Sequence, residues 1–322
     1  MSAGSLPSLI SAAVEHRRPL LLFSLTPPRR TVPEERLDRI AQATVERLQP
    51  LDLDALILYD LTDESDRTDS ERPFPYLATL DPAKFHRDHL HGWQGPTVIY
   101  RSVGKYDETE LSGWFAEQDP DRVATVLVGA SSGDAEVRTT LPVAQRLWRD
   151  STAGDTGAPI PMGAVAIPER HAARFDEHER MLRKQQAGTS FFVTQVVYDV
   201  DAARDLVSDY HYGCLDAGVV AAPVIFTLSV CGSLKTLEFL QWLGVRLPRW
   251  MHNELERTDD PLAESYRQCA AIATELAEFC TRLGVPYGFN VESVSTRKVE
   301  IEASVRLAAE LGDRMREGSR DA

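Results

Sequence analysis

Short apolar runs alternate with amphipathic segments along the whole chain, and this alternation most constrains the fold. Runs of strand length occupy residues 19–25, 53–59, 97–101, 123–128, 160–167, 190–194, 221–228 and 286–291. Helical spacing of apolar residues occupies 34–48, 108–117, 139–150, 176–186, 200–214, 233–243, 261–283 and 296–311. Strands that alternate with helices pair in parallel through right-handed crossovers. Eight such units predict an α/β fold, a closed (β/α)8 barrel of the TIM type; the rival, an open doubly wound sheet, would favour a G-x-G-x-x-G turn that no strand carries.

The predicted barrel forms a single domain at residues 19–313. Leu6–Val14 is mildly apolar and predicts a short lead-in helix within residues 1–18, while residues 314–322 are expected to form a polar tail. A chain of 322 residues with 43% hydrophobic content can bury one large core. The lead-in segment lacks the layout of a signal peptide, so we expect a cytoplasmic protein.

The charge balance argues against some classes of binding partner. The chain has 49 acidic and 35 basic residues, a formal net charge of -14, and no block of lysine and arginine. Nucleic acids and anionic membranes are therefore unexpected partners, and no apolar run approaches the ~20 residues of a membrane-spanning helix. The four cysteines lie far apart without a C-x-x-C pair, which predicts neither a zinc site nor a disulfide framework.

One segment, Gly163–Asp199, combines structural and chemical signals. An apolar strand ends at Pro168, the sequence PERH is expected to form a loop, a charged helix follows, and Ala187 and Gly188 end that helix. The next strand ends at Gln195. Because the carboxyl ends of parallel strands share one rim, PERH and Gln195 are predicted to lie at the same rim. Gln195 is expected either to bind a ligand or to cap neighbouring backbone.

Three other polar stretches invite a functional interpretation. Residues 60–72 predict a long exposed loop. The turn VGASSGD at residues 128–134 either cradles a phosphate or pterin with backbone N–H groups or forms a tight β–α loop. The histidines of HRDHLH, His86, His89 and His91, are expected in a polar loop rather than in a metal site, since no matching acidic or cysteine partner lies nearby.

The linked motifs P-E-x-H, D/E-x-x-R-x-x-x-K, A-G and F-x-x-T-Q-x-x-x-D within this segment resemble those of the methylenetetrahydrofolate reductase family. The resemblance extends to Pro27–Arg29 and to Gly244–Met251, and so covers most of the chain. It implies an eight-stranded barrel that binds FAD at its carboxyl rim. It also implies reduction of 5,10-methylenetetrahydrofolate with NAD(P)H, a reaction in which the protein orients and protonates while the cofactor carries electrons.

The resemblance assigns roles to individual residues. Glu169 and His171 match the flavin side of the site, and Gln195 matches a glutamine that contacts the pterin. The positions that would meet the FAD phosphates and ribose are Glu177, Arg180 and Lys184.

Several positions depart from the family pattern. Ser24 stands where the family has the acid that protonates the folate nitrogen, and a hydroxyl cannot deliver a proton near neutral pH as a carboxylic acid can. The candidates for a replacement acid are Asp60, Glu64 and Asp134. Positions expected to contact ligand with a changed residue type are Ser131 in place of an R-G-D aspartate, Ile167 in place of a tyrosine, and Leu234 in place of an aromatic residue. Val294 stands where the family has the arginine after the last strand, and Arg297 is expected to substitute for it through a shifted turn.

Three hypotheses follow from these matches and departures. The chain is a flavin-dependent reductase with a different acid, a reductase that transfers hydride from NAD(P)H without flavin, or a folate-binding or regulatory barrel without catalysis. The choice between NADH and NADPH, the pterin substrate, and whether the protein forms a homo-oligomer are open at this level.

Overall fold

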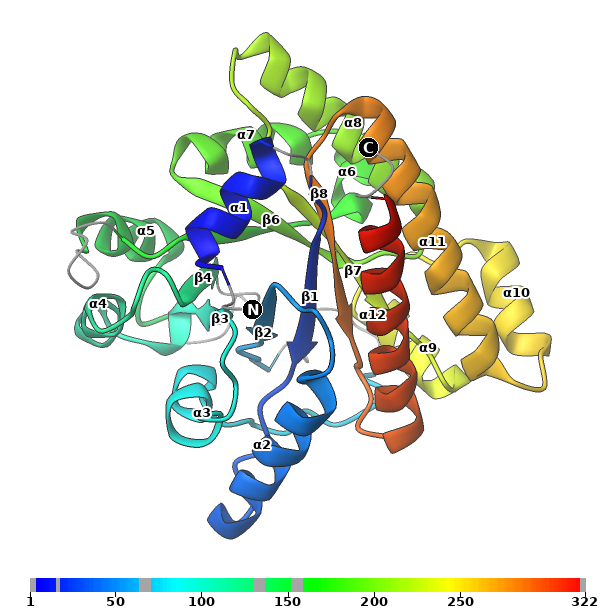
Figure 1. The fold of residues 1–322 in the computed structure, drawn as a ribbon, viewed down its shortest axis with the longest axis horizontal. Coiled ribbons are helices and arrows are strands. Elements are labelled where there is room, and N and C mark those ends of the chain that lie inside the picture. Colours follow the sequence, from blue (N-terminus) through cyan, green and yellow to red (C-terminus); the bar gives the residue numbers. More distant parts are fainter. Residues whose placement is uncertain (1–3, 16–17, 64–70, 130–136, 152–158, 319–322) are drawn as a thin grey trace.

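The computed structural model describes residues 4–15, 18–63, 71–129, 137–151 and 159–318, and these form a closed barrel of eight parallel strands (Figure 1). The strands are β1 Leu20–Leu25, β2 Ala55–Leu58, β3 Thr97–Ser102, β4 Val123–Val128, β5 Met162–Ala166, β6 Thr189–Val196, β7 Val224–Ser229 and β8 Tyr287–Glu292. They follow one another around the barrel in chain order, and β8 closes it by pairing with β1. The predicted (β/α)8 fold is confirmed.

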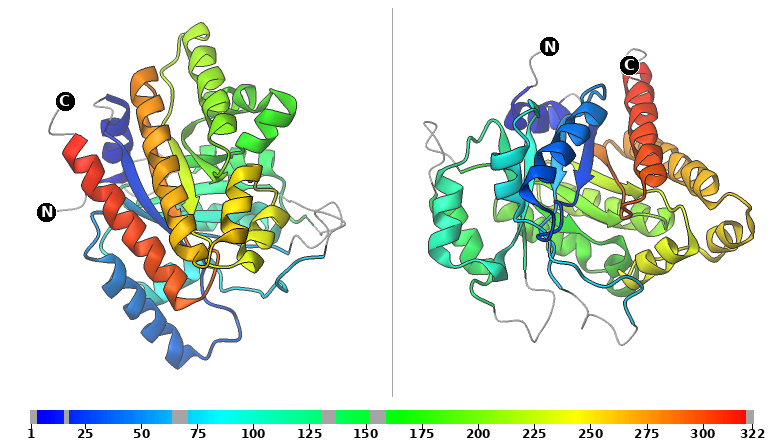
Figure 2. Two further views of the ribbon diagram at one scale, coloured as in Figure 1. Left: turned by 90° about the vertical axis from the view of Figure 1, so that its right-hand side faces the viewer. Right: turned by 90° about the horizontal axis from the view of Figure 1, so that it is seen from below.

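Helices cover the outside of the barrel (Figure 2). They are α1 Leu6–Glu15, α2 Glu34–Leu48, α3 Pro82–His89, α4 Glu108–Ala116, α5 Leu141–Asp150, α6 Pro168–Arg174, α7 Glu177–Gln186, α8 Val200–Asp216, α9 Leu234–Trp242, α10 Arg249–Arg257, α11 Pro261–Leu283 and α12 Lys298–Gly318, with a 3-10 turn η1 at Val103–Lys105. Among the described residues, no helix is long and apolar enough to cross a membrane.

Alternate residues of each strand point into the barrel. Toward the amino-terminal ends of the strands, these inward-facing residues are apolar. A buried cluster fills this part of the barrel, made of Leu20, Leu22, Ala55, Ile57, Val98, Ala124, Val126, Phe191, Val193 and Ile225. Gly163 on β5 leaves room for the Phe191 ring, since a Cβ at Gly163 would lie only 2.3 Å from it. The interior is therefore a packed core rather than a pore.

Helix α1 closes the amino-terminal end of the barrel. Leu6 and Ala13 are buried against the interior cluster, and the backbone N–H of Leu6 donates to Asp121 O just before β4 at 2.9 Å. Helix α1 thus covers the amino end, opposite the carboxyl end where barrel enzymes place their sites.

Two expectations about local structure were wrong, and one helix, α10, was not predicted. PERH is not a loop but the start of α6, because proline suits the first helical position, where its missing N–H costs nothing. The HRDHLH stretch begins inside α3, which Asp81 caps by accepting from Lys84 N at 3.0 Å. The segment after Pro248 forms α10.

The last helix is also longer than the pattern predicted. Helix α12 passes Leu311 and ends at Gly318, beyond the start of the expected polar tail. It packs beside α11 (Figure 1), and Arg314 on this extension donates to Thr274 of α11 at 2.7 Å. Met315 also packs against the main core. These contacts stabilise the last turns of α12, which the spacing of apolar residues did not predict.

Candidate active site

At the carboxyl end of the barrel, the interior positions change from apolar to polar. Ser24 on β1, Thr227 on β7, and Asn290 and Glu292 on β8 are buried, while Tyr59, which follows β2, is partly exposed. Each continues the inward-facing alternation of the apolar layers below. The barrel therefore presents a polar floor to its open mouth, which we call the mouth cluster.

Hydrogen bonds within the mouth cluster join strands β1, β7 and β8 and the residue after β2. Ser24 Oγ donates to Asn290 Oδ1 at 2.6 Å and lies 3.1 Å from Tyr59 Oη. The Asn290 amide donates to Tyr59 Oη and to Thr227 Oγ1, each at 3.2 Å. Tyr59 Oη in turn donates to Glu292 Oε2 at 2.6 Å. The network ends at the Glu292 carboxylate, because a carboxylate only accepts hydrogen bonds, whereas hydroxyl and amide groups also donate them.

Glu292 is the chemically distinctive member of the mouth cluster. Its side chain is only 7% exposed, and no lysine, arginine or histidine of the described chain forms an ion pair with it. Burial raises the pKa of Glu292 to about 7, while the hydrogen bond from Tyr59 opposes that rise. Burial and the nearby Glu292 charge hold the pKa of Tyr59 well above its ordinary value. Glu292 can therefore hold or release a proton near neutral pH.

The sequence interpretation missed Glu292, although it left a signal. Gly288, Asn290 and Glu292 alternate within a strand whose other residues are apolar, which is the pattern of an inward face carrying function. In the structure, Ser24 and Glu292 are direct register partners on β1 and β8. A carboxyl group thus lies one strand away from the position where the resemblance expected one.

Asp60, one of the three candidates for a replacement acid, has its carboxylate on the outer side of the barrel wall. It follows the inward-facing Tyr59, so its side chain points outward. Its carboxylate accepts from Ser102 N and from Tyr106 Oη, each at 2.8 Å, and forms an ion pair with Lys105. These contacts tie the end of β2 to the end of β3 and leave the carboxylate turned away from the mouth.

The three predicted substrate-binding residues reach different surroundings. Gln195 ends the inward-facing row of β6, is half-buried, and donates to Leu243 O at the end of α9 at 2.6 Å. Leu234 opens α9 and is exposed. Arg297 forms an ion pair with the buried Glu300 at 3.2 Å, and so links the loops after β7 and β8 through Gly232.

The PERH residues form the first turn of α6 and contact neighbouring elements. His171 is fully buried, and its Nε2 lies 3.1 Å from Asp209 Oδ2 on α8. Glu169 accepts from Arg246 N at 3.3 Å, and burial raises its pKa. Ile167, at the tyrosine position, is the residue before α6 and is half-buried.

The residues that the resemblance assigns to FAD phosphates and ribose do not fit that role as they stand. Glu177 is fully buried and pairs with Arg170 at 2.8 Å. Lys184 Nζ donates to Val165 O at 2.6 Å, and burial lowers the pKa of Lys184. Arg180 lies 3.8 Å from Asp176. Two of the three side chains thus have partners within the protein: Glu177 links α7 to α6, and Lys184 links α7 to β5.

Three further predicted residues lie outside the described residues: Ser131 and Asp134 of the glycine-rich turn and Glu64 of the acidic loop.

The histidines divide between two places. His89 bonds to Asp38 at 2.8 Å, and burial lowers the pKa of His86 to about 4. His171, His178 and Asp209 offer ligand-type atoms within 4.8 Å of one another between α6, α7 and α8. Since the contact between His171 and Asp209 accounts for part of this grouping, the grouping alone does not assign a metal.

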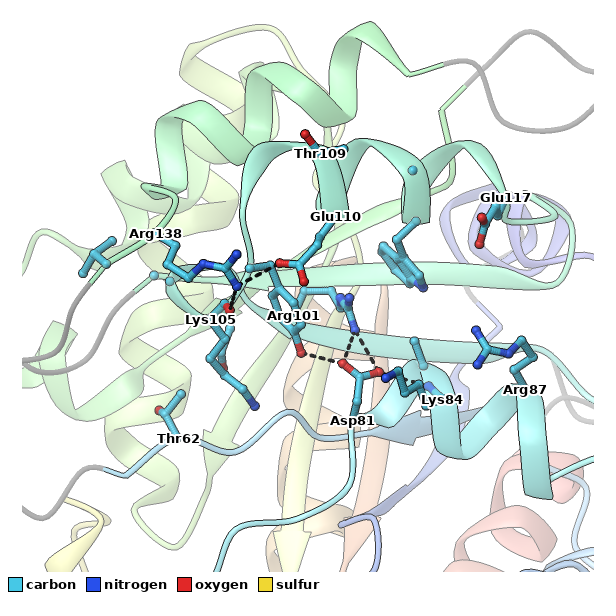
Figure 3. A pocket seen from close by; sticks show the side chains of 18 of the residues that line it. Thr62, Asp81, Lys84, Arg87, Arg101, Lys105, Thr109, Glu110, Glu117 and Arg138 are labelled. Atoms are coloured by element: carbon cyan, nitrogen blue, oxygen red, sulfur yellow. Dashed lines mark hydrogen bonds and ion pairs between the residues drawn. The ribbon is translucent and has the colours of Figure 1, made fainter. Parts of the chain in front are cut away.

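A cavity of about 790 Å³ lies outside the barrel wall, between α3 and α4 (Figure 3). Arg101 crosses its floor, stacks on the Tyr106 ring at 3.9 Å, and pairs with Asp81 at 3.0 Å. Arg138 pairs with Glu110 at 3.0 Å. The cavity is large enough for a small molecule. However, Arg101 and Arg138 already have acidic partners, whereas burial brings the pKa of Glu292 in the mouth cluster close to neutral pH.

The comparisons with known proteins agree with this architecture. The family model of methylenetetrahydrofolate reductase matches residues 157–288, which extend from before β5 to the start of β8. A comparison with curated protein sequences found no match. The oxygenating constituent of 3,6-diketocamphane monooxygenase from Pseudomonas putida, solved with FMN, shares only 9% identity over 90% of this chain and 97% of its own, with a TM-score of 0.52, which shows likeness of fold alone.

One solved structure is much more similar. It is an uncharacterized protein from Clostridium thermocellum that binds two copies of 5-methyl-5,6,7,8-tetrahydrofolic acid. It is 37% identical, the match covers 95% of this chain and 99% of that one, and the TM-score is 0.81. By the matching family model and this relative together, the chain belongs to the methylenetetrahydrofolate reductase family.

Proposed function

We propose that this protein binds a reduced folate with its pterin ring in the mouth of the barrel. It then reduces the methylene group of 5,10-methylenetetrahydrofolate, or of a related pterin, to a methyl group with hydride from NADH or NADPH. The observation that carries this proposal is the mouth cluster, in which a buried carboxyl group with a pKa of about 7 meets the open end of a barrel.

The chemistry of the mouth supports a pterin ligand. A pterin ring carries donors and acceptors along its edge and apolar faces above and below. Tyr59 and Glu292 supply polar groups, while Val128 and Val165, half-buried at the inward-facing ends of β4 and β5, supply apolar walls. Apolar walls with a few placed polar groups are typical of small-molecule sites.

The relative from Clostridium thermocellum supports the same ligand class. Its bound 5-methyltetrahydrofolate is the compound that the proposed reaction would form. The 37% identity over nearly the full length and the TM-score of 0.81 support a similar barrel in both proteins. We extend the ligand class, and not the number of copies, to this chain.

The role of FAD stays a prediction of the resemblance. When bound, FAD would relay electrons from nicotinamide to folate. The internal contacts of Glu177 and Lys184 favour the alternative that hydride passes directly from nicotinamide to the folate. In either case the contribution of the barrel is to orient the two reactants, exclude water and supply a proton.

The test measures oxidation of NADH and NADPH by purified protein with 5,10-methylenetetrahydrofolate, with and without added FAD, together with calorimetric binding of 5-methyltetrahydrofolate. We expect turnover and saturable binding. Binding without turnover under every condition would contradict the reductase and favour a non-catalytic folate-binding barrel. Neither binding nor turnover would contradict the whole proposal.

A further inference from the structure

The position that lacks an acid and the position that has gained one are neighbours in the barrel. Ser24 and Glu292 are paired residues of β1 and β8, and both face the interior. Tyr59 bridges them, at 3.1 Å from Ser24 Oγ and 2.6 Å from Glu292 Oε2. A carboxyl group entering the mouth from β8 can serve the same small volume as one entering from β1, because adjacent strands lie about 4.8 Å apart.

We propose that Glu292 is the proton donor of the folate reduction, in place of an acid at position 24. This inference rests on the proposed function. Among the described residues, Glu292 is the carboxyl group of the mouth cluster, whereas the carboxylate of Asp60 is held by three donors outside the barrel wall.

In this step Glu292 supplies the proton and reduced nicotinamide supplies the electrons. As the bond between the methylene carbon and one ring nitrogen breaks, the bonding pair stays on that nitrogen, which takes the proton from the Glu292 carboxyl. The methylene carbon is left as an iminium on the other nitrogen. Hydride from reduced nicotinamide, the reductant, then forms the third C–H bond and yields the methyl group. The Glu292 carboxylate regains a proton from water.

The surroundings of Glu292 suit a group that must be protonated before this step and charged after it. The titratable side chains of the described chain that face it are Tyr59 on the β2 side and Tyr100 on β3, whose rings meet edge to face at 5.0 Å. Both phenols stay neutral because burial and the Glu292 charge raise their pKa values. The Tyr59 hydroxyl donates to the carboxylate and so stabilises the form left after proton transfer.

The decisive variant is Glu292→Gln, which keeps shape and removes the proton. We expect kcat to fall at least about 100-fold, as for loss of a general acid, while binding of 5-methyltetrahydrofolate changes less than about fivefold. The double variant Ser24→Glu/Glu292→Gln should regain at least tenfold in kcat, because it returns a carboxyl group to the neighbouring strand. Glu264→Gln on α11, a similarly buried acid away from the mouth, is the matched control and should leave kcat within twofold.

The pH profile separates proton donation from a structural role. In the wild type, kcat should decline as pH rises through about 7, where the acid loses its proton. Tyr59→Phe removes the hydrogen bond that lowers the pKa of Glu292, so this decline should move to higher pH. If Glu292→Gln does not fold, an unmoved profile in Tyr59→Phe overturns the inference by itself.

The outcomes are distinguishable. Turnover in the wild type with kcat of Glu292→Gln within threefold overturns the donor role and leaves the proposed function intact. Absence of turnover in the wild type overturns the reduction itself, and the donor role with it. Turnover in the wild type with a large loss in Glu292→Gln and rescue from position 24 establishes both.

Discussion

Two buried carboxyl groups at the carboxyl rim, Asp60 and Glu292, have opposite surroundings. Asp60 follows β2 on the outer side of the wall and accepts from Ser102, Lys105 and Tyr106. Glu292 ends β8 on the inner side and accepts from Tyr59 at its carboxyl group without a cation. The ammonium and N–H donors around Asp60 stabilise its negative charge, whereas burial of Glu292 penalises its charge.

The contrast shows that position at the rim does not by itself make an acid catalytic. A side chain one residue further along a strand faces the opposite side of the sheet, where it meets the helices instead of the mouth. Asp60 therefore fastens the barrel wall, and Glu292 is available for chemistry. Substitutions at the two sites should separate a structural carboxylate from a reactive one.

The largest effect is expected from Asp60→Ala. Removing this carboxylate leaves Lys105 and Tyr106 without their buried partner, so we expect the free energy of unfolding to fall by about 3–5 kcal/mol. Urea denaturation at pH 7 measures this change. Glu275→Ala breaks a more exposed pair with Arg204 and should cost about 1 kcal/mol or less. Equal effects of the two substitutions would contradict the structural role of Asp60.

The second effect concerns the pH dependence of stability at Glu292. Because the folded pKa of about 7 lies above the ordinary 4.5, folded protein binds this proton more tightly than unfolded protein. The resulting stability is complete below pH 4.5 and is lost as pH rises through about 7. The difference corresponds to on the order of 3 kcal/mol. Glu292→Gln should not show this loss.

Chemical denaturation at pH 4.5, 6 and 8 tests this expectation. Other groups titrate over the same range in both proteins, so the quantity of interest is the difference between the wild type and Glu292→Gln. That difference should shift in favour of the variant as pH rises. A constant difference from pH 4.5 to 8 would show that Glu292 is an ordinary carboxylate, and would remove the distinction from Asp60.

The barrel could be predicted from sequence because its signals are local and repeated. Strands such as β4 and helices such as α11 begin and end where apolar spacing, proline and glycine indicate. Helices α3, α6 and α10 were not predicted, because each is short and begins at or next to a proline. The proline was interpreted as the end of a regular element, although proline is also common at the first position of a helix.

The candidate site was harder to predict, because the mouth cluster joins residues 24, 59, 227, 290 and 292. The sequence motifs indicate that Ser24 stands where the family has an acid. That Glu292 lies beside Ser24 follows only from the register of β1 against β8. Motif matching also could not tell that Glu177 and Lys184 point into the protein, since side-chain direction depends on how α7 packs.

A smaller effect is expected at Gln195, which lies at the same rim as Glu292. Its amide donates to Leu243 O, so Gln195→Ala should lower the free energy of unfolding by about 1 kcal/mol. Parallel calorimetry with 5-methyltetrahydrofolate extends the comparison to ligand binding. A loss of affinity above tenfold with little loss of stability would assign Gln195 to the pterin, as the resemblance implies; the reverse pattern would leave it as a cap of α9.

The smallest effect on stability is expected from Lys184→Met. This substitution tests a residue that contacts the barrel wall, for comparison with the residues of the mouth. Lys184 has one hydrogen bond to Val165 O and a pKa lowered by burial, so an apolar side chain of similar length should change stability by about 1 kcal/mol or less. Because this ammonium is turned toward β5, we also expect unchanged affinity for FAD, measured by quenching of flavin fluorescence. Arg183→Met, on the exposed face of the same helix, is the matched control. A loss of FAD affinity in Lys184→Met but not in Arg183→Met would show that α7 rearranges to release Lys184 to the cofactor, and would favour the flavin-dependent reductase over direct hydride transfer.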